Sequence, residues 1–418
     1  MTASPLRTPR NLSQGRGHQT QPIDRPCYLA LNQNPMLGSA EQCHLEWING
    51  FVAHDIGPQA ASWSLGQSPA PELYEKAAEL GLIGIEVATA DGGLGFGFAF
   101  KATACAAIAA ADFGFAMSVV NTHNVAARLA RTAPQAIKDR YLPKLLSGHL
   151  AACTALTEPG AGSDFAAIET TARKTSDGWV LKGEKSWIVN GRHAGLAIVF
   201  AQCADLEGAK GIGAFLIDLT VPGARRYAIE SAYSQTSIGT GGFVLDDVTV
   251  PNENLLLTPG EAFKAILSEI NGARSYVAAM CCAMLAAALR DASAYGEQRR
   301  TFGKPLSGHQ SWRMHLAQAT TDLAAAQALV AQAVEVVDRG CDAQLLAAEA
   351  KVHAVDTCQR HLPILLHAMG AEGLRAEYCV ARHLAAAQVA ALTDGSTAML
   401  LERVARLSLR QVRPEPKH

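Results

Sequence analysis

The run Thr157-Glu158-Pro159-Gly160-Ala161-Gly162-Ser163-Asp164 stands where the sequence changes from helical to strand-like patterning. Its two glycines flank a single alanine, so backbone amides in this turn can approach an anionic group without interference from Cβ atoms. The hydroxyl of Ser163 adds a hydrogen-bond donor. The same residues also suit an ordinary connecting turn, and the residues by themselves leave both interpretations open.

The patterns on either side of this run predict the fold class. Upstream, Pro71–Leu80 places apolar residues at helical spacing, and residues 102–111 have the composition of a buried helix. Downstream, short β-rich runs separated by Gly, Asp and Pro begin at Trp179, Leu196, Gly213 and Gly242. Long helical patterns return from Gly260. This order excludes a doubly wound α/β fold, which needs alternating strands and helices.

We therefore predict an α+β protein with three domains. An N-terminal α-helical domain covers residues 38–150, a middle antiparallel β domain covers 151–257, and a C-terminal four-helix-bundle domain covers 258–410. The glycine-rich segment Gly92–Gly97 does not fit G-x-G-x-x-G in any register, so we interpret it as a loop between helices.

The two ends of the chain are predicted to be disordered tails, residues 1–37 and 411–418. The first segment contains Arg7, Arg10, Arg16 and Arg25 against a single acid, Asp24. A basic, acid-poor segment is also typical of a mitochondrial transit peptide, which is the alternative. Its proline and glycine residues favour the tail because they would interrupt the amphipathic helix that such a peptide forms.

Composition excludes several classes of function. The 418 residues include 36 Lys and Arg against 38 Asp and Glu, which gives no basic excess for nucleic acid. The hydrophobic fraction of 49% excludes extensive disorder. The longest apolar run, 276–289, is shorter than the ~20 residues of a membrane span. The ten cysteines include no Cys-x-x-Cys pair and the histidines lack ligand spacing, so we predict no metal site.

Two further segments have competing interpretations. In Gly183–Gly191, Trp187 precedes an Asn-Gly pair, and its indole could be a core side chain or a wall beside a planar cofactor. In Glu297–Pro305, Arg299 and Arg300 stand beside Phe302 and a Gly-Lys-Pro turn. These arginines could match the dipole of a helix end or bind a phosphate.

These three segments, in this order and spacing, resemble the acyl-CoA dehydrogenase family over about residues 40–410. Further matches are Val250–Leu256, Arg274, Gly370-Ala371-Glu372-Gly373 and Asp394-Gly395-Ser396-Thr397. The resemblance implies FAD as cofactor and an oxidoreductase that acts on CH–CH bonds. The substrate would be an acyl thioester, carried by CoA or by an acyl carrier protein. A carboxylate removes its α proton while the β hydrogen leaves as hydride to flavin N5.

The resemblance also assigns roles to individual residues. Asp394 occupies the place of the catalytic base. Cofactor-binding positions are Leu156, Thr157, Gly162, Ser163, Trp187, Val189, Arg299, Phe302, Gln310, His367, Gly370 and Ser396. Substrate-binding positions are Ser163, which would meet the pantetheine or phosphate part, Arg274, Thr393 and Gly395. Of the cofactor set, Arg299, Phe302 and Gln310 match positions that reach the FAD of a neighbouring subunit. This implies a homodimer or homotetramer, and an electron-transferring flavoprotein as the partner that receives the electrons.

Three residues depart from the family pattern. Asp394 replaces the usual glutamate, and a carboxylate set back by about 1 Å can lose ~10²-fold in rate. The base position that some relatives use, one residue before the helix arginine, is Ala273 here. Val189 lacks the hydroxyl that relatives hydrogen-bond to flavin N5, and His367 replaces a glutamine. The alternative role for Asp394 is the N-cap of the helix that follows it.

We accordingly expect a cytoplasmic FAD-dependent acyl-thioester dehydrogenase that uses Asp394 as its base, or a matrix enzyme if residues 1–37 are a transit peptide. Two alternatives stay open. One is a flavin oxidase or monooxygenase of the same superfamily, similar to nitroalkane oxidases, which also use an aspartate base. The other is a catalytically silent flavoprotein.

Overall fold

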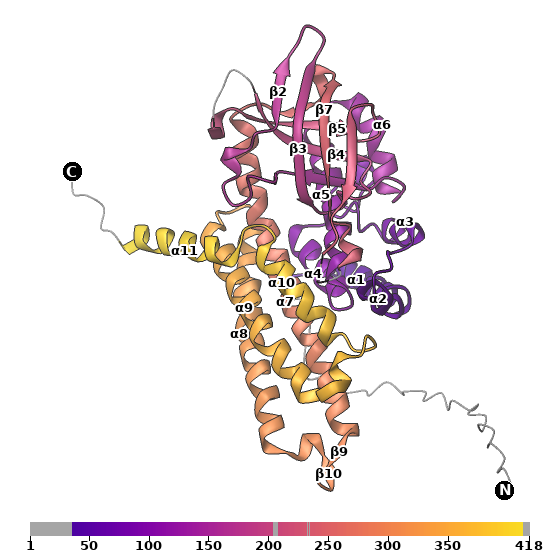
Figure 1. Ribbon diagram of the computed structural model, residues 1–418, viewed down its shortest axis with the longest axis vertical. Helices are drawn as coiled ribbons and strands as arrows, with labels where there is room; N and C mark the ends of the chain where they lie inside the picture. The colour runs from indigo at the N-terminus through magenta and orange to yellow at the C-terminus, as the bar shows by residue number, and fades with distance from the viewer. Residues whose placement is uncertain (1–35, 204–207, 232, 234, 413–418) are drawn as a thin grey trace, which may run out of the picture.

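A computed structural model of the chain describes residues 36–203, 208–231, 233 and 235–412. The predicted tails lie almost wholly outside these residues. Helices, then a sheet, then helices follow one another along the chain (Figure 1), which confirms the predicted α+β class and its three parts.

The N-terminal part is helical and packs around an apolar pair of helices, α4 and α5. Every residue of α4 except Ala107 is buried, because its apolar residues leave no polar face. The predicted helix at 71–80 and the loop at Gly92–Gly97 are both confirmed. The helices are α1 (Ser39–Phe51), a π-helical turn (Val52–Ile56), α2 (Gly57–Ser64), α3 (Pro71–Glu79), α4 (Phe98–Ala109), α5 (Phe113–Thr132) and α6 (Gln135–Leu146).

The middle part is a sheet with its own apolar core. The strands are β1 (Ala152–Ala155), β2 (Thr171–Lys174), β3 (Trp179–Ile188), β4 (Leu196–Cys203), β5 (Ile212–Asp218), β6 (Ala224–Ala228), β7 (Gly241–Val250) and β8 (Leu255–Leu257). The order is β6-β7-β3-β2-β4-β5-β8, and β1 pairs with β4. Because β4 runs parallel to both β1 and β2, the sheet is mixed and not wholly antiparallel as predicted.

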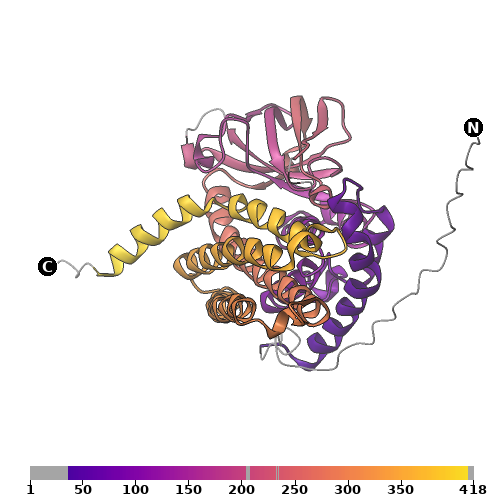
Figure 2. The ribbon, with the colours of Figure 1, turned by 60° about the horizontal axis from the view of Figure 1, so that its bottom comes forward.

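The C-terminal part is a bundle built around one long central helix. Its elements are α7 (Glu261–Gln298), the hairpin β9 (Arg300–Thr301) and β10 (Lys304–Pro305), α8 (Gln310–Asp338), α9 (Gln344–Met369), α10 (Val380–Leu392) and α11 (Thr397–Val412). The hairpin forms the tip of the molecule, and α11 runs outward from the bundle (Figures 1 and 2). Helix α7 has the length and hydropathy of a membrane span, but that stretch is wholly buried between its neighbours.

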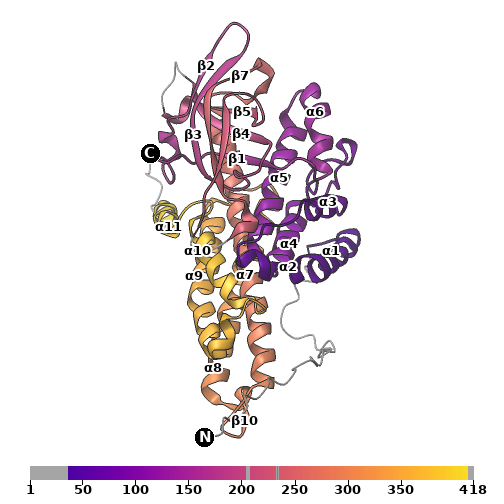
Figure 3. The same ribbon diagram turned by 45° about the vertical axis from the view of Figure 1, so that its right-hand side comes forward.

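Side chains from the bundle fasten it to the N-terminal helices. Arg382 and His383 of α10 bind the carbonyls of Ala111 and Ala110, which follow α4. Figure 3 shows the sheet above the bundle with α5 and α6 beside it. The end of α10 and the start of α11 therefore lie where the sheet meets the helices (Figure 1), and this junction contains the Asp394 loop.

Candidate active site

A buried ion pair fixes the turn at residues 157–164. The ammonium of Lys185, on β3, donates to Glu158 Oε1 over 2.7 Å and to the carbonyl of Leu156 over 2.9 Å. The same carboxylate accepts the backbone N–H groups of Glu169 and Thr170. Because both charged groups are buried and hydrogen-bonded to each other, the ion pair ties the turn to β3.

The outer face of this turn is open. A Cβ built on Gly160 or Gly162 would meet no atom of the chain within 4 Å, and neither glycine needs a left-handed backbone. Ser163 is exposed, while Leu156 and Thr157 are half-buried beside the turn. The glycines thus leave clearance for a group from outside the chain, and exposed amides with a hydroxyl suit an anionic one.

Trp187 is a surface residue and not a core one. Its side chain is 61% exposed although it belongs to β3, and its backbone adopts φ 59°. The loop after it is anchored by Asn190, which is fully buried and donates to the carbonyls of Ser118 and Ala152. An indole held outward on such a loop can cover one face of a planar ligand. The side chain of half-buried Val189 lies against the core.

The Asp394 loop is held by two buried cations. Arg274, on α7, donates from Nε to the carbonyl of Asp394 over 3.1 Å. Lys351, on α9, donates to the carbonyls of Thr393 and Gly395, the latter over 2.6 Å. Asp394 and Gly395 both have positive φ, 53° and 105°. The three backbone carbonyls of residues 393–395 accept the hydrogen bonds from these cations. The carboxylate of Asp394 is therefore not needed to hold the loop.

The Asp394 carboxylate has an unusual environment. Its Oδ2 atom is buried and has no hydrogen-bond partner. Burial raises the pKa of this carboxyl, and the positive charges of Lys351 and then Arg274 oppose that shift. Burial also lowers the pKa of Lys351 to about 8 and that of Arg274 to about 10. A carboxylate with a free oxygen and a raised pKa is suited to accept a proton from a ligand.

The alternative role of Asp394 as a helix cap is wrong. Helix α11 begins at Thr397, and one of the free amides of its first turn is satisfied by Ser396, whose Oγ accepts the N–H of Met399 over 3.3 Å. Ser396 is therefore the N-cap. The side chain of Asp394 is left for another role.

The remaining predicted residues lie at the other end of the bundle. Arg299 ends α7, and since an α-helix rises 1.5 Å per residue it stands about 37 Å from Arg274 along the axis. Phe302, at the tip of the hairpin, is 97% exposed. Gln310 starts α8, while His367 and Gly370 close α9. The segment after α9 also lies at this end, because the N–H of Cys379 binds Asp291 near the end of α7.

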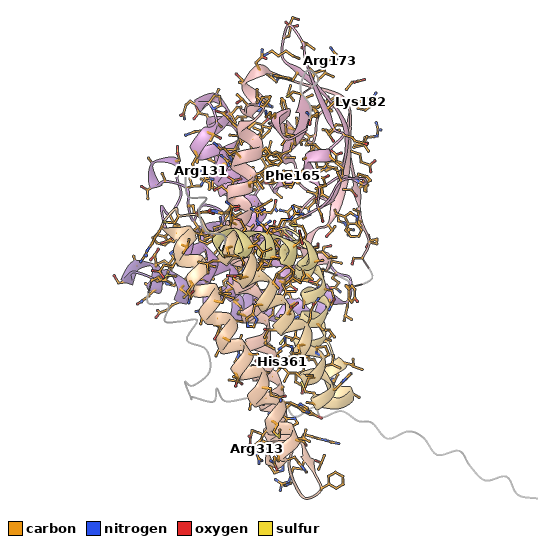
Figure 4. The ribbon with its side chains drawn as sticks, turned by 90° about the vertical axis from the view of Figure 1, so that its left-hand side faces the viewer. Arg131, Phe165, Arg173, Lys182, Arg313 and His361 are labelled. Carbon is orange, nitrogen blue, oxygen red and sulfur yellow. The ribbon has the colours of Figure 1, made fainter. Side chains whose placement is uncertain are left out.

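The structure thus divides the predicted residues into two groups. Figure 4 shows the separation through two neighbours of these groups: Phe165, directly after the turn, lies in the upper part, and Arg313, in the first turn of α8, lies near the opposite tip. One ligand cannot touch both groups within one chain. The arm group, which we define as Arg299, Phe302, Gln310, His367 and Gly370, is free to meet another subunit.

Sequence reasoning missed three residues that position the site: Lys185, Asn190 and Lys351. The first two lie in the segment Gly183–Gly191, where the sequence suggested no role for either. Lys351 had a signal of its own, because it lies four residues after Ala347 and four before Val355, on the apolar face of its helix. A lone cation on such a face marks a buried charge that needs partners. Over the described ranges, no cluster of His, Cys, Asp and Glu could hold a metal ion.

Three successive family models match the chain. They describe the acyl-CoA dehydrogenase N-terminal domain over residues 40–149, the middle domain over 153–248 and the C-terminal domain over 260–409. The matches cover nearly all of the described chain, and their borders fall between the helical and strand-rich parts.

Individual relatives agree with the family models. The chain is 31% identical to the glutaryl-CoA dehydrogenase of Desulfococcus multivorans over 84% of its length and 91% of the relative's. It is 34% identical to the short-chain specific acyl-CoA dehydrogenase of Megasphaera elsdenii over 70% of its length and 77% of the relative's.

Solved structures share the same architecture. The butyryl-CoA dehydrogenase of Megasphaera elsdenii has a TM-score of 0.85 at 30% identity, covering 90% of this chain and all of the other. A glutaryl-CoA dehydrogenase of Mycobacterium smegmatis in complex with FADH2 has a TM-score of 0.84 at 26% identity, covering 91% and 97%. A chain from a study of the electron transferring flavoprotein of Acidaminococcus fermentans has a TM-score of 0.85 at 28% identity, covering 90% of this chain and all of the other.

Proposed function

Because the chain belongs to the acyl-CoA dehydrogenase family, we propose that it removes hydrogen from the α and β carbons of an acyl thioester, with Asp394 as the base. At the level of the family, the protein is an FAD-dependent oxidoreductase that acts on CH–CH bonds. The observation that carries the finer proposal is the buried, unpartnered Oδ2 of Asp394 at the junction of the sheet and the bundle.

The residues present fit FAD. The open glycines and the exposed Ser163 leave room for its pyrophosphate, and exposed Trp187 offers a wall for the flavin ring. Val189 presents no hydroxyl, so one hydrogen bond to the ring, worth ~1 kcal/mol, is absent. The residues that would hold FAD are therefore Leu156–Ser163 and Trp187 of one chain with the arm group of another.

When bound, FAD supplies an acceptor for hydride. The chain's own part is to hold the thioester and to move one proton. Asp394 takes the α proton on its free oxygen, and its raised pKa makes it a stronger base than an exposed aspartate. Arg274 and Lys351 keep the loop in place, and Trp187 covers the ligand from the side of the sheet.

The partners follow from the same family. Relatives named for CoA thioesters support an acyl-CoA substrate, and an acyl carrier protein remains the alternative carrier. A structural neighbour from a study of an electron transferring flavoprotein supports that kind of electron acceptor. The position of the arm group supports a homodimer or homotetramer in which two chains complete each flavin site.

Replacing Asp394 tests the function. Asp394→Asn keeps the shape of the side chain but cannot accept the α proton, so we expect normal FAD content and a loss of ~10²–10⁴-fold in substrate-driven flavin bleaching under anaerobic conditions. The panel contains acyl-CoA and carrier-bound acyl thioesters. Asp246→Asn is the matched control, since it makes the same substitution at an exposed carboxylate on β7, outside the residues assigned to the site.

Two outcomes would contradict the proposal. Bleaching at the normal rate in Asp394→Asn would remove this residue from the mechanism. Rapid reoxidation of the reduced flavin by air, with bleaching by a nitroalkane and not by any thioester, would favour the oxidase alternative.

A further inference from the structure

Lys351 contacts the Asp394 loop in a way that the family assignment does not explain. Its ammonium, fully buried on α9, donates to the carbonyls of the residues just before and just after Asp394. Arg274 donates to the carbonyl between them. Three consecutive carbonyls are therefore turned toward two cations from different helices.

This contact has an energetic cost. Taking a lysine out of water disfavours its charged form, and burial is the main reason that its pKa falls to about 8. Neutral carbonyls compensate a buried ammonium less well than a carboxylate would. An apolar residue would fill this position on α9 at lower cost, so the charge must contribute something that packing cannot.

The charged groups that face Asp394 come from two helices. They are Lys351 of α9 and Arg274 of α7, and the phenol of Tyr276, also on α7, lies within the electrostatic influence of the carboxylate. Arg403 of α11 acts in turn on Arg274. Of the two cations that favour the Asp394 carboxylate, Lys351 has the larger influence.

We propose that Lys351 is a positioning residue for the base: it fixes the backbone of the Asp394 loop and stabilises the ionised carboxylate through space. The first effect follows from its hydrogen bonds to the two flanking carbonyls. They hold a loop whose residues 394 and 395 both have positive φ, a conformation that costs a non-glycine residue of order 1 kcal/mol or more. The second effect lowers the pH at which the base becomes ionised.

The inference rests on the proposed function for its effect on catalysis, but its effect on the carboxyl can be measured separately. Lys351→Met removes the charge and keeps the length of the side chain. Because a nearby positive charge lowers the pKa of a carboxyl, its removal should move the acid limb of the pH profile of kcat upward by on the order of one pH unit. At the pH optimum, loss of the Lys351 hydrogen bonds that hold the loop, here called the clamp, should lower kcat by ~10²-fold, with KM changed far less.

Three companion variants complete the test. Lys351→Gln, which can still hydrogen-bond, should fold even if Lys351→Met does not, and should show the same upward move of the acid limb. Lys351→Arg keeps the charge and should leave the limb in place. Lys101→Met is the matched control, since Lys101 is also a buried lysine but pairs with Glu86 of the N-terminal part and not with the Asp394 loop. Once loaded with FAD, that variant should show the acid limb of the pH profile at the same pH as the original protein.

The pKa of Asp394 itself gives the second measurement. The infrared band of its protonated carboxyl is the one missing in Asp394→Asn, and its pH titration should move upward in Lys351→Gln. An unmoved titration would overturn the inference, including the case in which Lys351 serves only the stability of the bundle. A moved titration with an unmoved activity profile would uphold the inference and reject Asp394 as the base.

Discussion

Strained residues gather at the proposed site. Five non-glycine residues of the described chain have positive φ, and four of them, Trp187, Asn190, Phe302 and Asp394, lie in or beside segments assigned to the cofactor or the base. Such backbone conformations persist only where neighbouring contacts hold them. Asn190 is held by α5 and β1, and Asp394 by Arg274 and Lys351. At the scale of the residue, the site is maintained by buried polar contacts behind it.

The Glu158–Lys185 pair allows a direct test of this support. Lys185→Met leaves a buried carboxylate without its cation, so the free energy of unfolding should fall by about 3–5 kcal/mol. FAD retention should fall with it, because the turn loses its tie to β3. Urea unfolding and flavin content measure both effects. Lys182→Met, on the exposed face of the same strand, should change neither by much. Stable, fully yellow Lys185→Met protein would contradict this account.

Single residues show where sequence reasoning stops. Asp394 and Trp187 were identified because a family motif contains them, and an exposed indole confirms that Trp187 is not a core residue. Lys351 could have been recognised as a buried cation on an apolar helix face, but its role could not, since its partners are backbone carbonyls 42 and 44 residues further along the chain. Every residue has a backbone carbonyl, so the sequence does not indicate which carbonyls a buried lysine will bind. Only the packing of α9 against the Asp394 loop reveals them.

At the scale of the element, periodicity predicted the helical character of both ends of the chain and the longer strands of the middle part, but not the pairing of the short strands. Strands β1 and β2 have four residues each, too few for a clear alternation. Both lie beside β4 in the parallel direction, which made the sheet mixed. The alternative role of Asp394 as a cap could not be rejected from the sequence, because Asp394 and Ser396 are both good caps, and the structure places the start of α11 directly after Ser396.

Helix α10 gives a prediction about pH. Burial, reinforced by Arg382, lowers the pKa of His383 to about 3, and its Nε2–H donates to the carbonyl of Ala110. Below an unfolded pKa of about 6.5 the unfolded chain binds the additional proton, so the free energy of unfolding falls as the pH falls from 6.5 toward 3. At pH 5 this one group accounts for about 2 kcal/mol, given its folded pKa of about 3.

Urea unfolding at pH 7.5 and pH 5 measures this contribution. In His383→Asn, the difference in unfolding free energy between the two pH values should be smaller by about 2 kcal/mol. His315→Asn, at an exposed position on α8, should leave the difference as it is in the original protein. An unchanged difference in His383→Asn would mean that this histidine titrates normally in the folded state.

At the scale of the whole molecule, the central helix separates the two halves of the site. Arg274 stands near the sheet and Arg299 at the far tip, about 37 Å apart along α7 by helix rise. Phe302, on a two-stranded hairpin, buries almost none of its surface within its own chain, although its ring stands edge-on to that of His309. In a two-fold symmetric pair, each arm can reach the other chain's turn, so that both sites are completed together.

This geometry predicts complementation between two defective chains. Asp394→Asn lacks the base, and the double variant Arg299→Ala, Phe302→Ala lacks the arm. In a mixed pair, one site collects both defects while the other combines an intact base with an intact arm. Random pairing makes half of the pairs mixed, so co-expression should restore about a quarter of the activity of the original protein. Neither variant alone should approach this level.

The control pairs two defects from the same end of the molecule. Asp394→Asn co-expressed with Lys351→Met should show no recovery above the Lys351→Met chains alone, because each site then takes its base and its clamp from one chain. Recovery in this control would mean that activity is gained without shared sites. Absence of recovery in the first mixture, with mixed pairs verified by two different affinity tags, would show that the arm serves its own chain or none.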